Sequence, residues 1–194
     1  MNLENNKYFN FKNKIVLITG SNGIIGNELC NFFFFFSAIV FGIDSKEKSV
    51  KNSKYTHFKG SVANDRFIFN KLSLIIKKHS KIDIILNCAA ISIFSHFEKR
   101  TKKEIDQTIN VNLIGTHNVI KNYVKLHTKK KLQSSRIINF GSIYGTNSPD
   151  FRIYGNNDRF NSEIYGASKA SIIQLTKYLG VMYIKKKIFI NCIS

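Results

Sequence analysis

The stretch Lys14-Ile-Val-Leu-Ile-Thr19-Gly20-Ser-Asn-Gly23-Ile-Ile-Gly26 decides how this chain folds. Residues 14–19 form an apolar, β-branched run typical of a buried strand, and an apolar helical pattern follows the glycines. Gly20 permits a tight turn, Gly23 lets the backbone approach a phosphate, and Gly26 lets helix and strand pack closely. A strand, a glycine turn and a helix start therefore predict an anion-binding site, although an ordinary glycine turn would share the pattern.

The second apolar run, residues 38–43, leads into Asp44, 18 residues after Gly26. A carboxylate at this position can accept hydrogen bonds from both ribose hydroxyls of an adenosine, and it would repel a 2′-phosphate. The sequence therefore predicts NAD as cofactor in preference to NADP. Lys46 and Lys48 oppose that preference, because either ammonium could reach a phosphate.

Tyr165 and Lys169 are four residues apart in Tyr165-Gly-Ala-Ser-Lys169, so they share one face of a predicted helix. A free phenol titrates near pH ~10, and a cation a few ångströms away favours the phenolate. Lys169 could supply that cation and make Tyr165 an acid or base. The pair alone would equally fit a half-buried aromatic residue beside a solvated lysine.

Apolar runs of strand length recur along the chain and alternate with helical patterns. The alternation predicts an α/β fold, a doubly wound parallel sheet with helices on both faces. We expect a single domain over residues 14–194, preceded by a loose polar leader at residues 1–13. The runs lie at residues 14–19, 38–43, 55–59, 82–87, 136–140 and 187–193.

From about Asn13 to its last residue, the chain resembles the short-chain dehydrogenase/reductase family, whose members have an NAD(P)-binding Rossmann fold. The resemblance rests on several motifs in the family's order. Cys88 and Ala90 depart from the family's Asn-Asn-Ala-Gly motif. The matching segments are Thr19-Gly20-x-x-Gly23-x-x-Gly26, Asn87-Cys88-Ala89-Ala90, Asn110-Val-Asn112-Leu-Ile-Gly115, Arg136-Ile-Ile-Asn-Phe-Gly-Ser142-Ile-Tyr-Gly145 and the pair Tyr165 and Lys169.

The resemblance implies a role for each matched residue. Tyr165 would exchange a proton with the reacting oxygen while hydride moves between the substrate and the nicotinamide. Lys169 would lower the pKa of Tyr165 and bond the nicotinamide ribose. Ser142 would hold the substrate oxygen, and Asn112 would fix a water for a proton relay. The implied cofactor-binding residues are Gly20, Ser21, Asn22, Gly23, Ile24, Ile25, Gly26, Asp44, Asn87, Ala89 and Lys169.

Simpler roles are open to the polar residues of this set. Asn87 and Asn112 could cap helices or satisfy backbone groups, and Ser142 could form a turn at a strand end. Motifs that occur in the family's order, each on the expected strand or helix, favour the shared catalytic role.

The chain departs from the family pattern between Ser142 and Tyr165, which are separated by more residues than is common. Arg152, Tyr154 and Arg159 in this segment could contact a polar or anionic substrate, or the segment could be an uninvolved surface insertion. A similarly lengthened segment is familiar in oxidoreductases of bacterial cell-surface sugar modification, which suggests a sugar or sugar derivative as substrate.

A second departure is the end of the chain. Residues 187–194 resemble the sixth strand of the family, and the usual seventh strand and substrate lid do not follow. We therefore expect a C-terminally truncated form of the fold with an open substrate pocket. An open pocket admits water and orients substrate poorly, so turnover could be low.

The formal net charge of +18 suggests a different class of partner. Clusters such as Lys129-Lys-Lys131 and Lys185-Lys-Lys187 can bind phosphate backbones without sequence preference. Because the clusters fall at predicted helix ends and no nucleic-acid-binding motif accompanies them, we expect no specific nucleic acid partner.

Nothing in the sequence predicts a membrane, metal or disulfide. The longest apolar run, Phe32 to Ile43, is shorter than the ~20 residues that a bilayer requires, and the start lacks the apolar core of a signal peptide. Cys30, Cys88 and Cys192 show neither disulfide nor zinc spacing. We therefore expect no metal, no membrane and a cytoplasmic location.

Three functions remain open from the sequence. The first is an NAD-dependent oxidoreductase acting on a small alcohol or ketone. The second is a cofactor-binding remnant with impaired catalysis, and the third is a basic polyanion-binding module. The family resemblance further implies a homodimer through long helices starting near Glu98 and Glu163.

Overall fold

The computed structural model describes residues 10–47, 50, 52–154 and 161–194. They build a sheet of six parallel strands in the order β3-β2-β1-β4-β5-β6. This is the Rossmann strand order, and it confirms the predicted doubly wound α/β fold. Each predicted apolar run overlaps one strand, to within two residues at either end: β1 (Ile15–Thr19), β2 (Ile39–Asp44), β3 (Tyr55–Lys59), β4 (Ile84–Asn87), β5 (Ser135–Phe140) and β6 (Ile188–Ile193).

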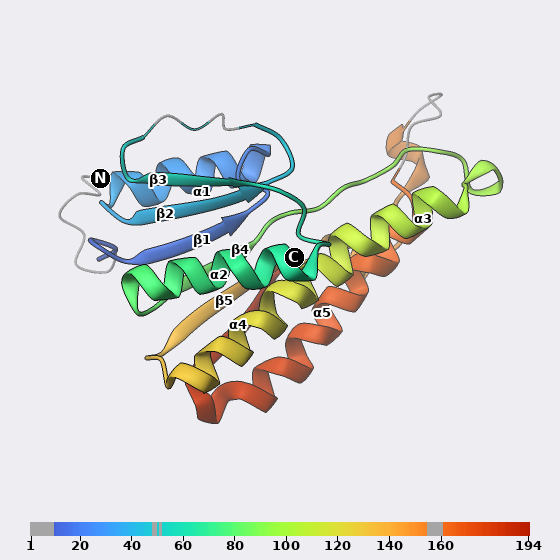
Figure 1. Ribbon diagram of the computed structural model, residues 1–194. Coiled ribbons are helices and arrows are strands. Elements are labelled where there is room, and N and C mark those ends of the chain that lie inside the picture. The colour runs from blue at the N-terminus through green and yellow to red at the C-terminus, as the bar shows by residue number, and fades with distance from the viewer. Residues whose placement is uncertain (1–9, 48–49, 51, 155–160) are drawn as a thin grey trace.

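Helices cover both faces of the sheet, as Figure 1 shows. α1 packs on β1 and β2 on one face, while α2, α4 and α5 cover the other. The α-helices are α1 (Ile24–Phe35), α2 (Asp65–His79), α3 (Lys102–Ile109), α4 (Thr116–Lys130) and α5 (Glu163–Tyr183). A π-helix, η3 (Asn110–Gly115), joins α3 to α4, and short 3₁₀ turns are η2 (Phe97–Lys99), η4 (Ile143–Gly145), η5 (Phe151–Tyr154) and η6 (Ile184–Lys186).

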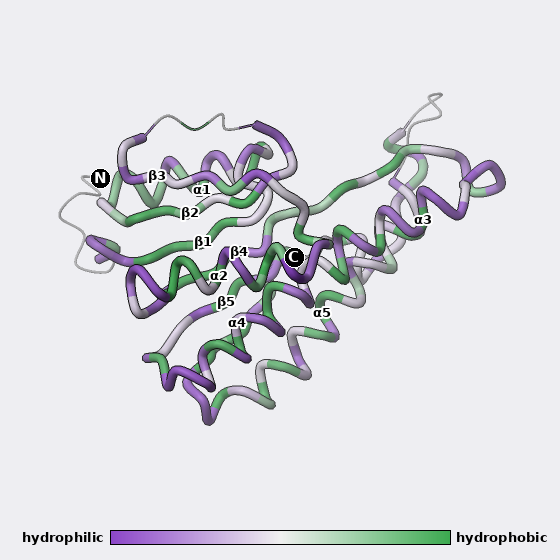
Figure 2. The backbone as a smooth tube through the Cα atoms, viewed as in Figure 1, coloured by the Kyte–Doolittle hydropathy of each residue, from purple (hydrophilic) through white to green (hydrophobic). Residues whose placement is uncertain are grey.

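The alternation of strand side chains creates two cores. Leu17 and Ile43 point to the face of α2, α4 and α5, where they pack with Leu72. Val16 and Ile18 point to the opposite face and pack with residues of α1. Figure 2 shows β1 and β2 as predominantly hydrophobic, in keeping with strands that are buried on both sides.

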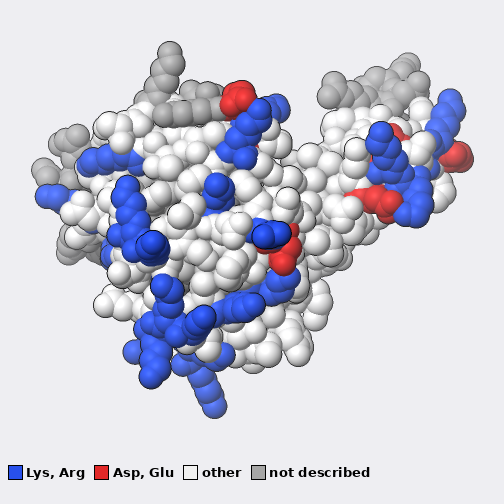
Figure 3. Space-filling view, viewed as in Figure 1, with Lys and Arg blue, Asp and Glu red and all other residues white. Residues whose placement is uncertain are grey.

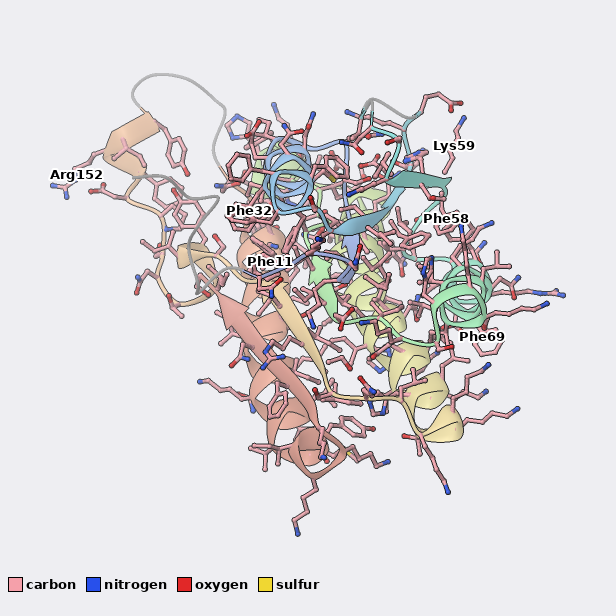
Figure 4. All side chains as sticks on the ribbon, turned by 90° about the vertical axis from the view of Figure 1, so that its left-hand side faces the viewer. Phe11, Phe32, Phe58, Lys59, Phe69 and Arg152 are labelled. Atoms are coloured by element: carbon pink, nitrogen blue, oxygen red, sulfur yellow. The ribbon has the colours of Figure 1, made fainter. Side chains whose placement is uncertain are left out.

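The five-phenylalanine run ends α1 and divides between core and surface. Phe33 and Phe36 are buried, whereas Phe32 and Phe35 are 38% and 53% exposed. Phe11 packs edge-on against Phe32 and Phe33, with ring centroids 5.9 and 5.1 Å apart, and Figure 4 shows Phe11 beside Phe32. Phe11 therefore joins the predicted leader to α1, while residues 1–9 lie outside the described residues.

The helix near Glu98 begins later than expected. Glu98 lies in η2, and α3 begins after Thr101, whose side chain accepts from the Glu104 backbone N–H. The Glu104 carboxylate accepts from the Thr101 backbone N–H in return, which completes a capping box. The reciprocal cap explains why the helix starts here.

The basic clusters lie largely at helix C-termini, where positive charge interacts favourably with the helix dipole. In a parallel α/β sheet these ends gather at the amino edges of the strands. Lysines crowd the lower left of the face shown in Figure 3. The clustered residues include Lys77 and Lys78 of α2, Lys129 and Lys130 of α4, and Lys185 and Lys186 of η6.

Among the described residues, no helix is long and apolar enough to cross a membrane.

Burial on α2 predicts a sharp contrast between two leucines. Leu72 is fully buried, whereas Leu74 is 52% exposed. Leu72→Ala should lower the free energy of unfolding by about 2–5 kcal/mol because it leaves a cavity. Leu74→Ala should change it by less than about 0.5 kcal/mol. Urea unfolding of both variants measures the difference, and equal losses would contradict this packing of α2.

Candidate active site

The candidate site lies at the carboxyl edge of the sheet, between the neighbouring strands β1 and β4. Strands β2 and β3 are added on one side of this point, and β4 to β6 are added on the other. Open α/β sheets bind ligands at such a switch point. A cleft of about 280 Å³ opens there between the loops that follow β1, β2, β3 and β4. Its lining includes the predicted cofactor residues Gly20, Gly23, Asp44 and Ala89.

The glycine turn is built by close backbone contacts. Gly20 has a φ of +66°, and a Cβ there would lie 2.8 Å from the Cα of Ala89. A Cβ on Gly26 would overlap the carbonyl oxygen of Gly20. Only glycine fits either position without displacing backbone.

The start of α1 suits an anion. Its N-cap is Gly23, which has no side chain to occupy the free N–H groups of the first turn. Ile24 and Ile25 follow and are 91% and 57% exposed, so this turn faces solvent. The cradle is therefore of the kind in which a pyrophosphate would fit.

Asp44 is held at the end of β2 by backbone N–H groups. Its Oδ2 accepts from the N–H of Asn22 at 3.0 Å, and its Oδ1 accepts from the N–H of Lys46 at 2.9 Å. The Asn22 side chain donates to the carbonyls of Lys46 and Glu47. Each carboxylate oxygen keeps a second lone pair, so the ribose hydroxyls of an adenosine would fit here.

A series of hydrogen-bonded, buried polar side chains lies beside the candidate site. Asn87 Nδ2 donates to Asn139 Oδ1 at 2.8 Å, and Asn139 Nδ2 donates to Thr176 Oγ1 at 2.8 Å. These bonds join β4, β5 and α5. Asn87 Oδ1 is buried and has no hydrogen-bond partner among the described residues, which leaves one acceptor available at this edge.

Asn112 lies within the π-helix η3 and is also buried. Its Oδ1 accepts from the Ile91 N–H at 2.8 Å, and its Nδ2 donates to the Ile91 carbonyl and to Ser168 Oγ, each at 3.0 Å. Ser168 Oγ in turn donates to the carbonyl of Tyr165. Asn112 thus joins the loop after β4 to the turn of α5 that carries Tyr165.

Tyr165 and Lys169 share one face of α5, as their spacing predicts. The Ser162 side chain caps the helix by accepting from the Tyr165 N–H at 3.1 Å. Lys169 Nζ lies 5.6 Å from the centroid of the Tyr165 ring and donates to the Phe140 carbonyl at 2.6 Å. Burial lowers the pKa of Lys169, while the nearby thiols of Cys192 and Cys88 oppose that shift.

Ser142 is placed beside the same helix turn. It ends the segment that leaves β5, and its Oγ accepts from the Tyr144 N–H at 3.2 Å. η4, which follows Ser142, packs against α5 so closely that a Cβ on Gly145 would lie 2.9 Å from the Ala170 backbone nitrogen. The end of β5 and the start of α5 therefore bring Ser142, Tyr165 and Lys169 to one region.

Only part of the segment between Ser142 and Tyr165 lies near the residues Ser142, Tyr165 and Lys169. Tyr154 Oη lies 3.1 Å from Tyr144 Oη, whereas Arg152 pairs with Asp150 and points away from the body of the molecule in Figure 4. A cavity of about 510 Å³ beside this segment is lined by residues such as Tyr144 and Phe151. Arg159 and Lys48 lie outside the described residues.

Several residues at the site were not predicted from the sequence. Ser61 and Val62 follow β3 and line the cleft, and Thr19 Oγ1 accepts from the Ala89 N–H at 3.2 Å. Parallel strands all end at the same edge of the sheet, so the residues that follow β3 must lie beside those that follow β1 and β2. This rule would have indicated residues 60–62 as part of the site. Asn139, a polar residue inside the apolar run of β5, is a second such signal.

Comparisons with known proteins agree with this geometry. The family model for short chain dehydrogenases matches residues 14–194. A short chain dehydrogenase from Leptospira borgpetersenii, solved with bound NAD+, is similar at 36% identity and a TM-score of 0.87, over 95% of this chain and 71% of that one.

Curated relatives give the same family. An uncharacterized oxidoreductase of Schizosaccharomyces pombe is 29% identical over 88% of this chain, which spans 61% of that relative's length. A 3-oxoacyl-[acyl-carrier-protein] reductase of Thermotoga maritima is 26% identical over 93% of this chain and 72% of its own length. The chain belongs to the short chain dehydrogenase family, whose members are NAD(P)-dependent oxidoreductases.

The contacts of Asn112 predict a measurable structural role. Asn112→Ala removes three hydrogen bonds and leaves the Ile91 backbone groups unpaired, so the free energy of unfolding should fall by about 1–3 kcal/mol. Asn110→Ala, at an exposed position of the same π-helix, should have little effect. Denaturant unfolding distinguishes them, and a neutral Asn112→Ala would refute the bridging role.

Proposed function

We propose that this chain is an NAD-dependent oxidoreductase that interconverts an alcohol and a ketone or aldehyde. The observation that carries the proposal is the convergence of two halves on one sheet edge. The glycine turn and Asp44 border one cleft, which supports a dinucleotide site, and the buried Lys169 lies 5.6 Å from the Tyr165 ring centroid and bonds the Phe140 carbonyl at the end of β5.

The cofactor would be held along the carboxyl edge. In this proposal the α1 N-terminus, from Gly23 to Gly26, receives the pyrophosphate, and Asp44 accepts from the adenosine ribose. Ser21 and Asn22 shape the turn, Asn87 and Ala89 border the nicotinamide half, and Lys169 bonds its ribose. Because a carboxylate disfavours a 2′-phosphate, NAD is preferred over NADP.

When bound, the cofactor accepts or donates hydride at its nicotinamide ring. Tyr165 gives a proton to the substrate oxygen during reduction, or removes it during oxidation. The ammonium of Lys169 favours the tyrosinate by its charge. Ser142 donates a hydrogen bond to the substrate oxygen, and Asn112 holds the loop after β4 in place and orders a water for proton transfer to Lys169.

The substrate would be a small alcohol or carbonyl compound, with a sugar or sugar derivative as the narrower proposal. Tyr144 and Tyr154 offer adjacent hydroxyl groups beside the segment that follows Ser142, which suits a polyhydroxyl ligand. A homodimer through the helices that start near Glu98 and at Glu163, which are α3 with its continuation α4 and α5, and a location in a reducing cytoplasm complete the proposal, in which nucleic acid and membrane play no part.

Tyr165→Phe tests the chemical role directly. The wild-type protein is first screened with NAD+ and alcohols, sugars included, to find a turnover assay. In that assay Tyr165→Phe should lower kcat at least ~10²-fold, because it removes the acid–base hydroxyl. The NADH Kd, measured by nicotinamide fluorescence, should change less than about twofold.

The control for Tyr165 is Tyr178→Phe, a 66% exposed position on the same helix, which should leave both quantities unchanged. Substantial turnover by Tyr165→Phe would reject the assignment. Saturable NADH binding by the wild-type protein without turnover on any substrate would instead support the reading as a cofactor-binding remnant.

Asp44 tests the cofactor preference. Asp44→Asn keeps the shape of the side chain and removes its charge, so NADPH should bind more tightly and NADH more weakly. We expect the ratio of the two Kd values to change about tenfold, equivalent to ~1.4 kcal/mol. Asp106→Asn, on the surface of α3, is the control. An unchanged ratio in Asp44→Asn would exclude the ribose role.

A further inference from the structure

Side chains of β3 reach under the glycine turn and bond to it. Tyr55, the first residue of β3, is 6% exposed, and its hydroxyl donates to Ser21 Oγ at 2.9 Å. Ser21 is fully buried within the turn. Burial raises the pKa of Tyr55 to about 12, so its hydroxyl stays protonated at neutral pH.

His57, two residues along the same strand, extends this contact to the loop after β2. Its Nδ1 lies 3.2 Å from Tyr55 Oη, and its Nε2 lies 3.0 Å from the Lys46 carbonyl oxygen. Residues two apart on a strand share a face, so Tyr55 and His57 act from one side of β3. A carbonyl can only accept, so Nε2 carries a proton. In that tautomer Nδ1 is an acceptor, so the single proton of the Tyr55 hydroxyl is shared between Ser21 Oγ and His57 Nδ1.

The Asn22 side chain also donates to the Lys46 carbonyl, which connects Lys46 back to the glycine turn. A ring of hydrogen bonds therefore runs from Ser21 through Tyr55 and His57 to Lys46 and back to the turn at Asn22. The ring links the segment at the phosphate cradle to the segment at Asp44.

One position of β2, Gly42, leaves space for this ring of hydrogen bonds. Gly42 pairs with His57 in the sheet, and a Cβ on Gly42 would overlap both the Tyr55 hydroxyl and Ser21 Oγ. The Tyr55 ring also packs edge-on against Phe34 of α1, with centroids 6.0 Å apart. Tyr55 is thus seated between β2, α1 and the turn.

We propose that Tyr55 and His57 are positioning residues for the cofactor cleft, which hold the glycine turn and the segment of residues 44–47 at a fixed separation. Neither lines the cleft, so they act through Ser21 and the Lys46 backbone. Without the Tyr55 and His57 side chains, the glycine turn, which would bind the pyrophosphate, and residues 44–47, which would bind the ribose, would move independently. The predicted loss of cofactor affinity rests on the proposed function, whereas the effect on segment order does not.

The chain offers a matched pair of buried tyrosines for the test. Tyr123 is fully buried, its hydroxyl lies 2.5 Å from Ser135 Oγ, and it donates to the Ile82 carbonyl at 3.1 Å. Ser135 begins β5, so this contact is at the amino edge of the sheet, away from the cleft. Tyr55→Phe and Tyr123→Phe each remove one hydroxyl bonded to a buried serine.

The first measurement is amide hydrogen exchange of the cofactor-free protein. Tyr55→Phe should speed exchange at residues 20–27 and 44–47 severalfold, because local opening there becomes easier. Tyr123→Phe should leave those residues at the wild-type rate, whatever its effect on the melting temperature. His57→Ala, at a partly exposed position, should speed exchange at residues 44–47 most.

The second measurement is the NADH titration of the same variants. Tyr55→Phe should raise the NADH Kd about fivefold to tenfold, the loss expected for one ordering hydrogen bond, and should raise the KM for NAD+ in the turnover assay with kcat unchanged. Tyr123→Phe should leave the Kd unchanged.

Wild-type exchange rates at residues 20–27 and 44–47 in Tyr55→Phe, or equal effects of the two tyrosine variants on the Kd, would overturn the inference. A wild-type protein that binds no NADH would refute the proposed function, and hydrogen exchange would then decide the positioning role alone.

Discussion

Backbone packs against backbone around Gly20, and the geometry of the cleft depends on that contact. The turn after β1 must touch the segment after β4 at Ala89 and the start of α1 at Gly26, and neither contact leaves space for a Cβ. Because these contacts are made, Gly23 at the N-cap of α1, Asp44 at the end of β2 and the segment that follows β4 all border one cleft. Any side chain at Gly20 or Gly26 would separate these segments, so the glycines determine the shape of the cleft.

The other half of the site depends on buried polar groups instead of glycines. Asn87, Asn139 and Thr176 connect β4 to α5, and Asn112 connects the loop after β4 to the same helix. A buried polar network that is nearly satisfied fixes one arrangement of the elements it joins. Lys169 is the costly member of this region, since burial disfavours its charge and lowers its pKa. Its bond to the Phe140 carbonyl offsets part of that cost, and Lys169 Nζ lies 5.6 Å from the centroid of the Tyr165 ring.

Local patterns in the sequence were enough to predict the six strands, their parallel arrangement and the glycine turn between β1 and α1. Each of those features follows from apolar periodicity and from glycine positions near in sequence. Contacts between distant side chains were not predictable. Nothing near Tyr55 or His57 signals a bond to a turn 34 residues away, and nothing near Asn112 signals its bond to Ile91, 21 residues away. α3 begins at Lys102, four residues after the expected start near Glu98, because the capping box of Thr101 and Glu104 fixes the start there. The catalytic roles of Tyr165, Lys169, Ser142 and Asn112 stay a prediction.

Titration of the wild-type protein with NADH and with NADPH, followed by nicotinamide fluorescence, tests the central claim most directly. The cleft beside Asp44 predicts saturable binding of one NADH per chain and weaker binding of NADPH. A folded protein, verified by circular dichroism, that binds neither dinucleotide would show that this edge of the sheet is not a cofactor site. Tighter binding of NADPH than of NADH would contradict the role given to Asp44.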